Sequence, residues 1–171
     1  MPKIAGYQIT EEIYTSKRTI VYRGIRQVDH QPVILKYLNR EFPTQQEIEK
    51  LHHEYEILGN LQIDGVVKAL ALEKVNNSVM IVMQEKHAIS LKQWMNQNHK
   101  KGVTDVKICL EYFIRFCEVL AEVHKKGIFH RDIKPDNIIV EPTSGKIFLI
   151  NFGKAVNSFD DALALEDGMS F

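Results

Sequence analysis

The most informative segment of this chain is His130-Arg131-Asp132-Ile133-Lys134-Pro135-Asp136-Asn137. Its eight residues include two carboxylates, three basic side chains and an amide around one proline. A carboxylate can accept or orient the proton of a hydroxyl group, and an amide oxygen can ligate a metal ion. A polar turn containing a proline would explain any three of these residues, but it does not explain all eight in this order.

This segment resembles the catalytic loop of eukaryotic-type protein serine/threonine kinases. The resemblance implies that Asp132 accepts or orients the proton of a substrate hydroxyl and that the Asn137 amide oxygen ligates magnesium. It also implies that Lys134 steadies the transferring phosphoryl group. The implied fold is α+β and protein-kinase-like, with a five-stranded antiparallel N-lobe that carries one main helix, followed by the start of a helical C-lobe.

Two charged residues upstream of the loop follow the order of the same family. Val33-Ile34-Leu35-Lys36 resembles the strand motif whose lysine pairs with the α- and β-phosphates of ATP. Glu54 resembles the helix glutamate that holds this lysine. Taken alone, Lys36 is more simply an edge-strand lysine and Glu54 a half-buried helix acid, but an intact catalytic loop downstream favours the ion pair.

The nucleotide site differs from the family pattern at its phosphate loop. The family's glycines let backbone N–H groups approach phosphate. Counting back from Val21, the three glycine positions fall on Tyr14, Ser16 and Thr19. Lys17-Arg18 is interpreted as a solvated hairpin tip rather than as a substitute phosphate site. Met83-Gln84-Glu85 resembles the hinge that reads adenine, so Glu85 is expected to contact the nucleotide. Val21, which follows the phosphate loop, is also expected to contact it.

The metal site also differs from the family pattern. Asn151-Phe152-Gly153 stands where the family has Asp-Phe-Gly, nineteen residues after Asp132. Asparagine keeps an acceptor oxygen but loses the negative charge. Removing this charge at about 4 Å from a positive charge costs on the order of 4 kcal/mol at an effective dielectric of 20, which is roughly a thousandfold in rate. We therefore expect ATP binding with weak magnesium binding through Asn137 and Asn151, and weak catalysis at best.

The pattern on both sides of the loop predicts strands, a helix, strands, two helices and a hairpin. The strands are expected at 7–9, 19–23, 33–38, 66–72 and 79–83, the helices from 44, 91 and 104, and the hairpin at 138–150. The first helix begins with a capping box formed by Thr44 and Glu47. Glu54 projects from its apolar stripe, which is unusual for a carboxylate without a partner.

The last predicted helix, from Thr104 to Gly127, carries an apolar face that includes Val106, Leu110, Phe113, Cys117 and Leu120. Cys109 and Cys117 are interpreted as core residues rather than as a disulfide. The chain is expected to divide into an N-lobe at 1–85 and a partial C-lobe at 86–171. Because no Ala-Pro-Glu motif follows Gly153, we expect a truncated C-lobe that leaves this face exposed.

Composition restricts the class of protein without naming a function. The chain has 171 residues, and 22 basic residues balance 22 acidic ones, so bulk charge does not favour nucleic-acid binding. We find no apolar run of ~20 residues and no signal peptide. These features predict a soluble, cytoplasmic protein without a membrane span.

The N-terminal part also resembles a narrower group. Gly6-Tyr7-Gln8-Ile9 and the glycine-free loop before Val21 are similar to the N-terminal kinase domains of large bacterial, especially cyanobacterial, signalling proteins with histidine-kinase modules downstream. Three functions remain open: a serine/threonine kinase acting on a protein substrate, a pseudokinase that binds a nucleotide or a signalling partner, and a truncated fragment without independent function. By family we favour the kinase, and we expect its activity to be weak or absent.

Overall fold

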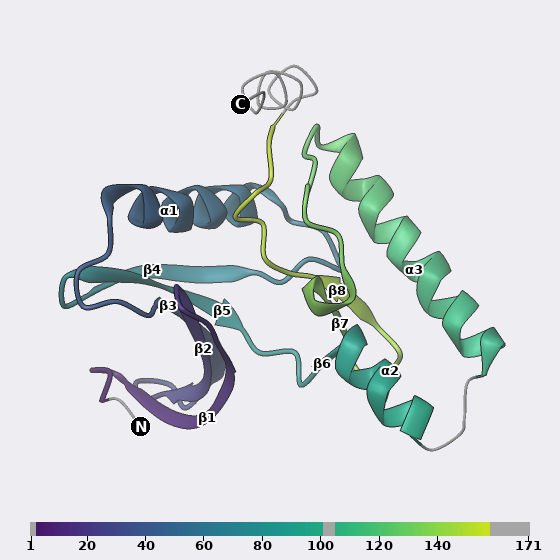
Figure 1. Cartoon of the computed structure of the whole chain (residues 1–171), viewed down its shortest axis with the longest axis horizontal. Helices are drawn as coiled ribbons and strands as arrows, with labels where there is room; N and C mark the ends of the chain where they lie inside the picture. Colours follow the sequence, from purple (N-terminus) through teal and green to yellow (C-terminus); the bar gives the residue numbers. More distant parts are fainter. Residues whose placement is uncertain (1–2, 101–104, 158–171) are drawn as a thin grey trace. The chain divides into compact units, whose positions relative to one another are not determined.

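The computed structural model describes residues 3–100 and 105–157. The chain divides into two compact units (Figure 1). The first contains Met1–Gly59 and Val67–Lys86, and the second contains Asn60–Val66 and His87–Phe171. The predicted start of the last helix at Thr104 lies outside the described residues.

The first unit is built on an antiparallel sheet of five strands in the order β1-β2-β3-β5-β4, as the α+β prediction required. Its elements are β1 (Tyr7–Thr15), β2 (Thr19–Arg26), β3 (Pro32–Leu38), α1 (Gln45–Asn60), β4 (Ala69–Val75) and β5 (Ser78–Gln84). Side chains alternate between the two faces of a strand. Val33 and Leu35 therefore lie in the core on one face of β3, while Lys36 points to the other face, toward α1.

The strand predicted at 66–72 is wrong in its bounds. Strand β4 runs from Ala69 to Val75, and its turn into β5 passes through Asn76 at a φ of +53°. Val66 instead donates its N–H to Ile63 and forms an isolated parallel bridge with Leu149. An apolar run indicates burial, but it does not reveal which backbone pairs with which, so the sequence placed this strand three residues too early.

The second unit combines a small sheet with two helices. Its elements are β6 (Ile89–Ser90), α2 (Leu91–Lys100), α3 (Val106–Lys125), the 3₁₀ helix η1 (Pro135–Asn137), β7 (Ile138–Val140) and β8 (Ile147–Leu149). The three strands pair in the order β6-β7-β8. One hydrophobic cluster of this unit contains Ile138, Val140 and Ile147, with Leu91, Tyr112 and Phe116 packed against it.

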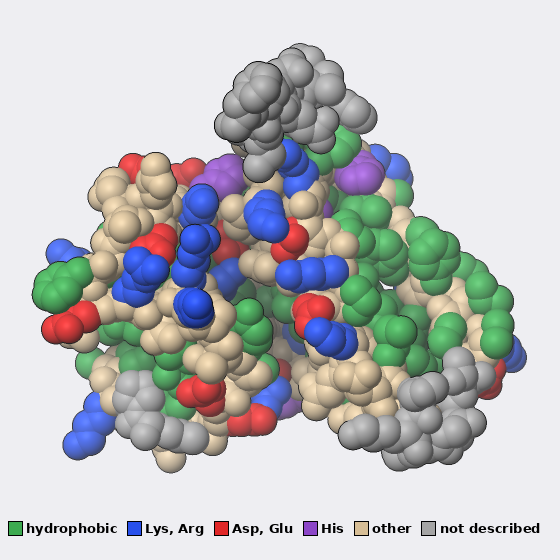
Figure 2. Space-filling model, viewed as in Figure 1, with side chains coloured by type: hydrophobic (Ala, Val, Ile, Leu, Met, Phe, Trp, Pro, Cys, Tyr) green, Lys and Arg blue, Asp and Glu red, His purple; other side chains and the backbone are tan. Residues whose placement is uncertain are grey.

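Helix α3 buries one apolar face and exposes another. Tyr112 and Phe116 pack on the sheet, whereas the opposite face is open, and Figure 2 shows hydrophobic side chains along it. The exposed fractions there are 67% for Val106, 56% for Leu110 and 61% for Phe113, as the sequence predicted for this face.

The interpretation of Cys109 and Cys117 as core residues is wrong, because both are free and exposed. The helix is apolar on more than one side, and only the sheet decides which side is covered. None of the helices within residues 3–100 and 105–157 combines the length and apolar character needed to cross a membrane.

Candidate active site

A buried ion pair joins β3 to α1 in the first unit. The Lys36 Nζ donates to both oxygens of Glu54, at 2.7 Å to Oε1 and 2.5 Å to Oε2. Only 2% of the Glu54 side chain is exposed, compared with 12% for Lys36. Burial of a carboxylate is costly unless a charge offsets it, so this pair explains the acid on the apolar stripe of α1. The contact that the sequence predicted is present.

The other nucleotide-site candidates lie on or beside the same sheet. Val21 on β2 stands directly opposite Lys36 in the antiparallel register, so both side chains are on one face. Glu85 follows β5, is buried, and accepts a hydrogen bond from Arg23 Nε at 2.9 Å. Sequence reasoning missed Arg23, because its partner is distant in the chain.

The turn between β1 and β2 is closed by hydrogen bonds of its own. The Ser16 hydroxyl oxygen accepts from the N–H groups of Arg18, at 3.3 Å, and Thr19, at 3.0 Å. The Ser16 N–H donates to the Thr19 carbonyl at 2.9 Å. Lys17 and Arg18 are exposed, as predicted for a hairpin tip. These N–H groups are already bonded within the turn, so this turn differs from a glycine-rich phosphate cradle.

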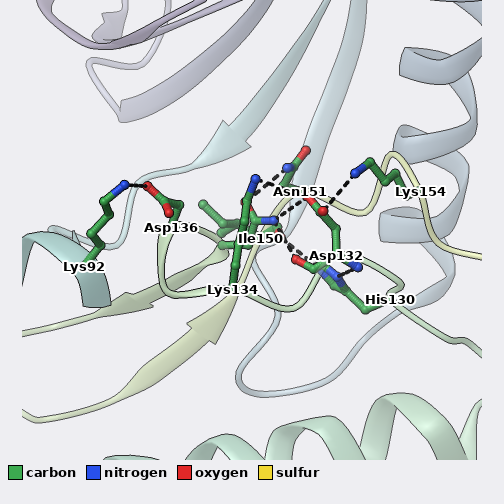
Figure 3. Close-up of polar contacts among 9 residues, drawn as sticks. Lys92, His130, Asp132, Lys134, Asp136, Ile150, Asn151 and Lys154 are labelled. Atoms are coloured by element: carbon green, nitrogen blue, oxygen red, sulfur yellow. Dashed lines mark hydrogen bonds and ion pairs between the residues drawn. The ribbon is translucent and has the colours of Figure 1, made fainter.

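In the second unit, the catalytic loop is organised around Asp132 (Figure 3). The Asn137 Nδ2 donates to the Asp132 carbonyl at 2.7 Å and to its Oδ2 at 2.8 Å. The Lys154 Nζ donates to Oδ1 at 2.8 Å, and the Lys134 Nζ lies 3.5 Å from Oδ2. The Lys154 ammonium, assisted by Asn137 and Lys134, holds the pKa of Asp132 below its ordinary value against the effect of burial.

His130 stabilises the backbone of this loop through hydrogen bonds of both ring nitrogens. Its Nδ1 accepts the Asp132 N–H at 3.2 Å, so the proton resides on Nε2, which donates to the Ile150 carbonyl at 2.9 Å. The ring meets Phe152 edge to face at a centroid distance of 4.6 Å, and both side chains are buried. This packing ties residues 130–132 to the Asn151-Phe152-Gly153 segment.

Asn151 is held in an unusual conformation and acts as a donor. Its φ is +69°, a region that asparagine tolerates better than most residues. Its Nδ2 donates to the Asn137 Oδ1 at 3.1 Å. The sequence predicted the loss of a charge at this position but not the gain of a hydrogen-bond donor.

Comparison with known proteins decides the family. The model of the protein kinase domain matches residues 7–163. The chain belongs to the protein kinase family. Relatives of this kinase domain include serine/threonine-protein kinase nekl-2 of Caenorhabditis elegans, which is 28% identical over 137 residues, or 77% of this chain and 38% of the relative. Casein kinase II subunit alpha' of Saccharomyces cerevisiae is 26% identical over 167 residues, or 90% of this chain and 43% of the relative.

A bacterial relative supports the same assignment. Serine/threonine-protein kinase PknD of Chlamydia trachomatis is 30% identical over 121 residues, or 66% of this chain and 13% of the relative. This kinase domain thus spans less than half the length of these three relatives. By family it is a serine/threonine protein kinase domain, a class that in general uses ATP and Mg²⁺.

The donor set of this kinase domain does not fit a magnesium ion. Magnesium is usually bound through carboxylates in near-ideal octahedral geometry. The two residues expected as ligands, Asn137 and Asn151, are neutral, and the Asn137 Oδ1 already accepts a hydrogen bond from Asn151. Within the described part of the chain, no three His, Cys, Asp or Glu side chains gather as a metal cluster.

Lys154 is the residue of this region that sequence reasoning missed. It follows directly after Asn151-Phe152-Gly153. A basic residue close to an asparagine that replaces the family's aspartate was the sequence feature that could have indicated its role. Its contact with Asp132 crosses 22 residues of sequence.

Proposed function

We propose that this chain is the nucleotide-binding part of a serine/threonine protein kinase that binds ATP with little dependence on magnesium and transfers its γ-phosphoryl group weakly or not at all. The single observation that carries the proposal is the buried Lys36–Glu54 pair. In this proposal residues 1–85 form the N-lobe and residues 86–171 a partial C-lobe.

The Lys36 ammonium supplies the main attraction for the nucleotide phosphates. Glu54 holds it in one position on β3, so little side-chain entropy remains to be lost on binding. Val21 shares its face of the sheet, which suits an apolar contact with the adenine or ribose. The closed turn at Ser16 supplies few backbone donors, and this supports weak rather than tight binding.

The catalytic roles are assigned by residue type and position. Asp132 orients the hydroxyl of the protein substrate and accepts its proton, and Lys134 steadies the transferring group. The lowered pKa of Asp132 makes its carboxylate a weaker base than an ordinary aspartate. Together with the poor fit for magnesium, this favours slow transfer.

A pseudokinase-type signalling module is the second candidate. The observation that favours it is the Asn151–Asn137 hydrogen bond, which uses one of the two lone pairs of the oxygen that a metal would need. In either case we propose a cytoplasmic location, supported by two free, exposed cysteines that suit a reducing compartment. A protein substrate or signalling partner would bind to the second unit, which contains the catalytic loop.

Nucleotide binding is tested by titrating a fluorescent ADP analogue into the full chain, with either magnesium or a chelator present. We expect similar affinities in the two conditions and a loss of at least tenfold in Lys36→Met. Lys50→Met, which removes an exposed lysine from α1, is the matched control and should bind as the wild type does. Equal binding by Lys36→Met, or a large gain with magnesium, would contradict the proposal.

Transfer is tested separately with labelled ATP and a generic basic protein as the acceptor. We expect transfer near background for the wild type and no further loss in Asp132→Ala. Robust transfer that disappears in Asp132→Ala would instead establish an active kinase.

A further inference from the structure

Each carboxylate of the catalytic loop faces an ammonium group (Figure 3). The Asp132 Oδ1 accepts from Lys154 at 2.8 Å, and the Asp136 Oδ1 lies 3.2 Å from the Nζ of Lys92. The Asp132 side chain is 16% exposed, so this charge is partly removed from water. A divalent cation approaching Asp132 must therefore displace, or be repelled by, an ammonium that is already in place.

The amide groups complete the same network. Asn137 uses its Nδ2 as a donor to Asp132, which leaves its Oδ1 as the end available to a metal. That oxygen accepts from the Asn151 Nδ2 at 3.1 Å. An aspartate at position 151 has no hydrogen to donate, so only the amide can make this contact. The resulting series of hydrogen bonds runs from Asn151 through Asn137 to Asp132 and ends at Lys154.

We propose that Asn151 and Lys154 together replace the divalent cation at this loop. The Asn151 amide holds Asn137, and the Lys154 ammonium neutralises Asp132, so the loop keeps its shape without a metal. The inference rests on the proposed function, because it takes Asp132 and Asn137 as the kinase loop residues. Lys154 is 68% exposed, and an exposed ion pair contributes modestly, so we expect its removal to change metal affinity severalfold.

The test is nucleotide-free binding of Mn²⁺ to the full chain, followed by the electron paramagnetic resonance signal of the free ion. We expect no measurable binding at this loop in the wild type and weak binding in Asn151→Asp. In Asn151→Asp/Lys154→Met, binding should be at least threefold tighter than in Asn151→Asp/Lys107→Met. Lys107 is exposed on α3, so the two double variants have the same net charge.

A conservative variant separates charge from structure. Asn151→Asp/Lys154→Arg retains a cation beside Asp132 and should bind Mn²⁺ as weakly as Asn151→Asp does. Equal affinity of the two charge-matched variants would overturn the role of Lys154. Tight binding by the wild type, or no binding by any variant, would overturn the replacement itself. Because Lys36 is intact and no nucleotide is present, these outcomes are independent of ATP binding.

Discussion

Gly65 leaves little room for a side chain. Its φ is +110°, and a Cβ added there would lie 2.3 Å from Cγ2 of Val119. Strain at a positive φ and overpacking each cost on the order of 1–3 kcal/mol, so Gly65→Ala should lower the free energy of unfolding by about 3 kcal/mol.

Denaturant unfolding of the full chain measures this cost. Gly59→Ala is the control, because Gly59 lies in α1 with open space around its Cβ position, and there alanine should stabilise the protein by roughly 0.5–1 kcal/mol. Equal stabilities of Gly65→Ala and the wild type would contradict the expectation.

A second prediction concerns the contribution of the Lys36–Glu54 ion pair to the stability of the protein. Lys36→Met leaves a carboxylate that is 2% exposed without its ion-pair partner, so it should destabilise the protein by about 3 kcal/mol. Adding Glu54→Leu removes the unpaired charge and should recover most of this loss. A double-mutant cycle in denaturant measures the coupling, and simple addition of the two costs would show that the pair is not coupled.

At the scale of an element, the start of α1 depends on a reciprocal cap. The Thr44 N–H donates to Glu47 Oε2 at 2.9 Å, and the Glu47 N–H donates to the Thr44 hydroxyl at 3.3 Å. The Thr44 N–H, followed by its hydroxyl and Arg40, lowers the pKa of Glu47. A carboxyl group with a lowered pKa stabilises the folded state above its unfolded pKa and loses this effect as the pH falls through the folded value.

Glu47→Gln should therefore lower the unfolding temperature most at pH 7. The difference from the wild type should shrink below pH ~4.3, the ordinary glutamate pKa, and vanish under more acidic conditions. Circular dichroism melts between pH 3 and pH 7 provide the measurement. Glu56→Gln, on the exposed side of α1, is the control for removing one carboxylate from the helix. A difference that stays constant with pH would contradict the assignment.

For the molecule as a whole, we predict that copies of the chain associate through the exposed apolar face of α3. Leu110, Phe113 and Ile114 expose 56%, 61% and 57% of their surface on one helix. Large exposed apolar patches promote association. Sedimentation velocity at rising concentration should show oligomers for the wild type and mostly monomer for Leu110→Lys/Phe113→Lys.

The control for this association is Val28→Lys, because Val28 is 85% exposed but lies in the β2–β3 turn, which belongs to the other unit. It should associate as the wild type does. A wild-type chain that stays monomeric at high concentration and binds no hydrophobic dye would refute the prediction.

The sequence predicted the resemblance to protein kinases, the Lys36–Glu54 contact and the capping box of α1. These features depend on short motifs or on residue types that have few stable alternatives, such as a carboxylate on an apolar helix face. The sequence also identified the neutral residue at position 151.

The contacts of Asn151, and the identity of the cation beside Asp132, became visible only in the folded chain. The bonds Asn151–Asn137 and Lys154–Asp132 join residues 14 and 22 positions apart, and Asn151 has a positive φ that the sequence did not predict. The same reason applies to Ser16, whose hydroxyl closes the β1–β2 turn, and to Cys117, which packing of α3 on its sheet left exposed. Hydrogen bonds and burial are settled by the path of the backbone, because a side chain can bond only to groups that the fold brings within about 3 Å.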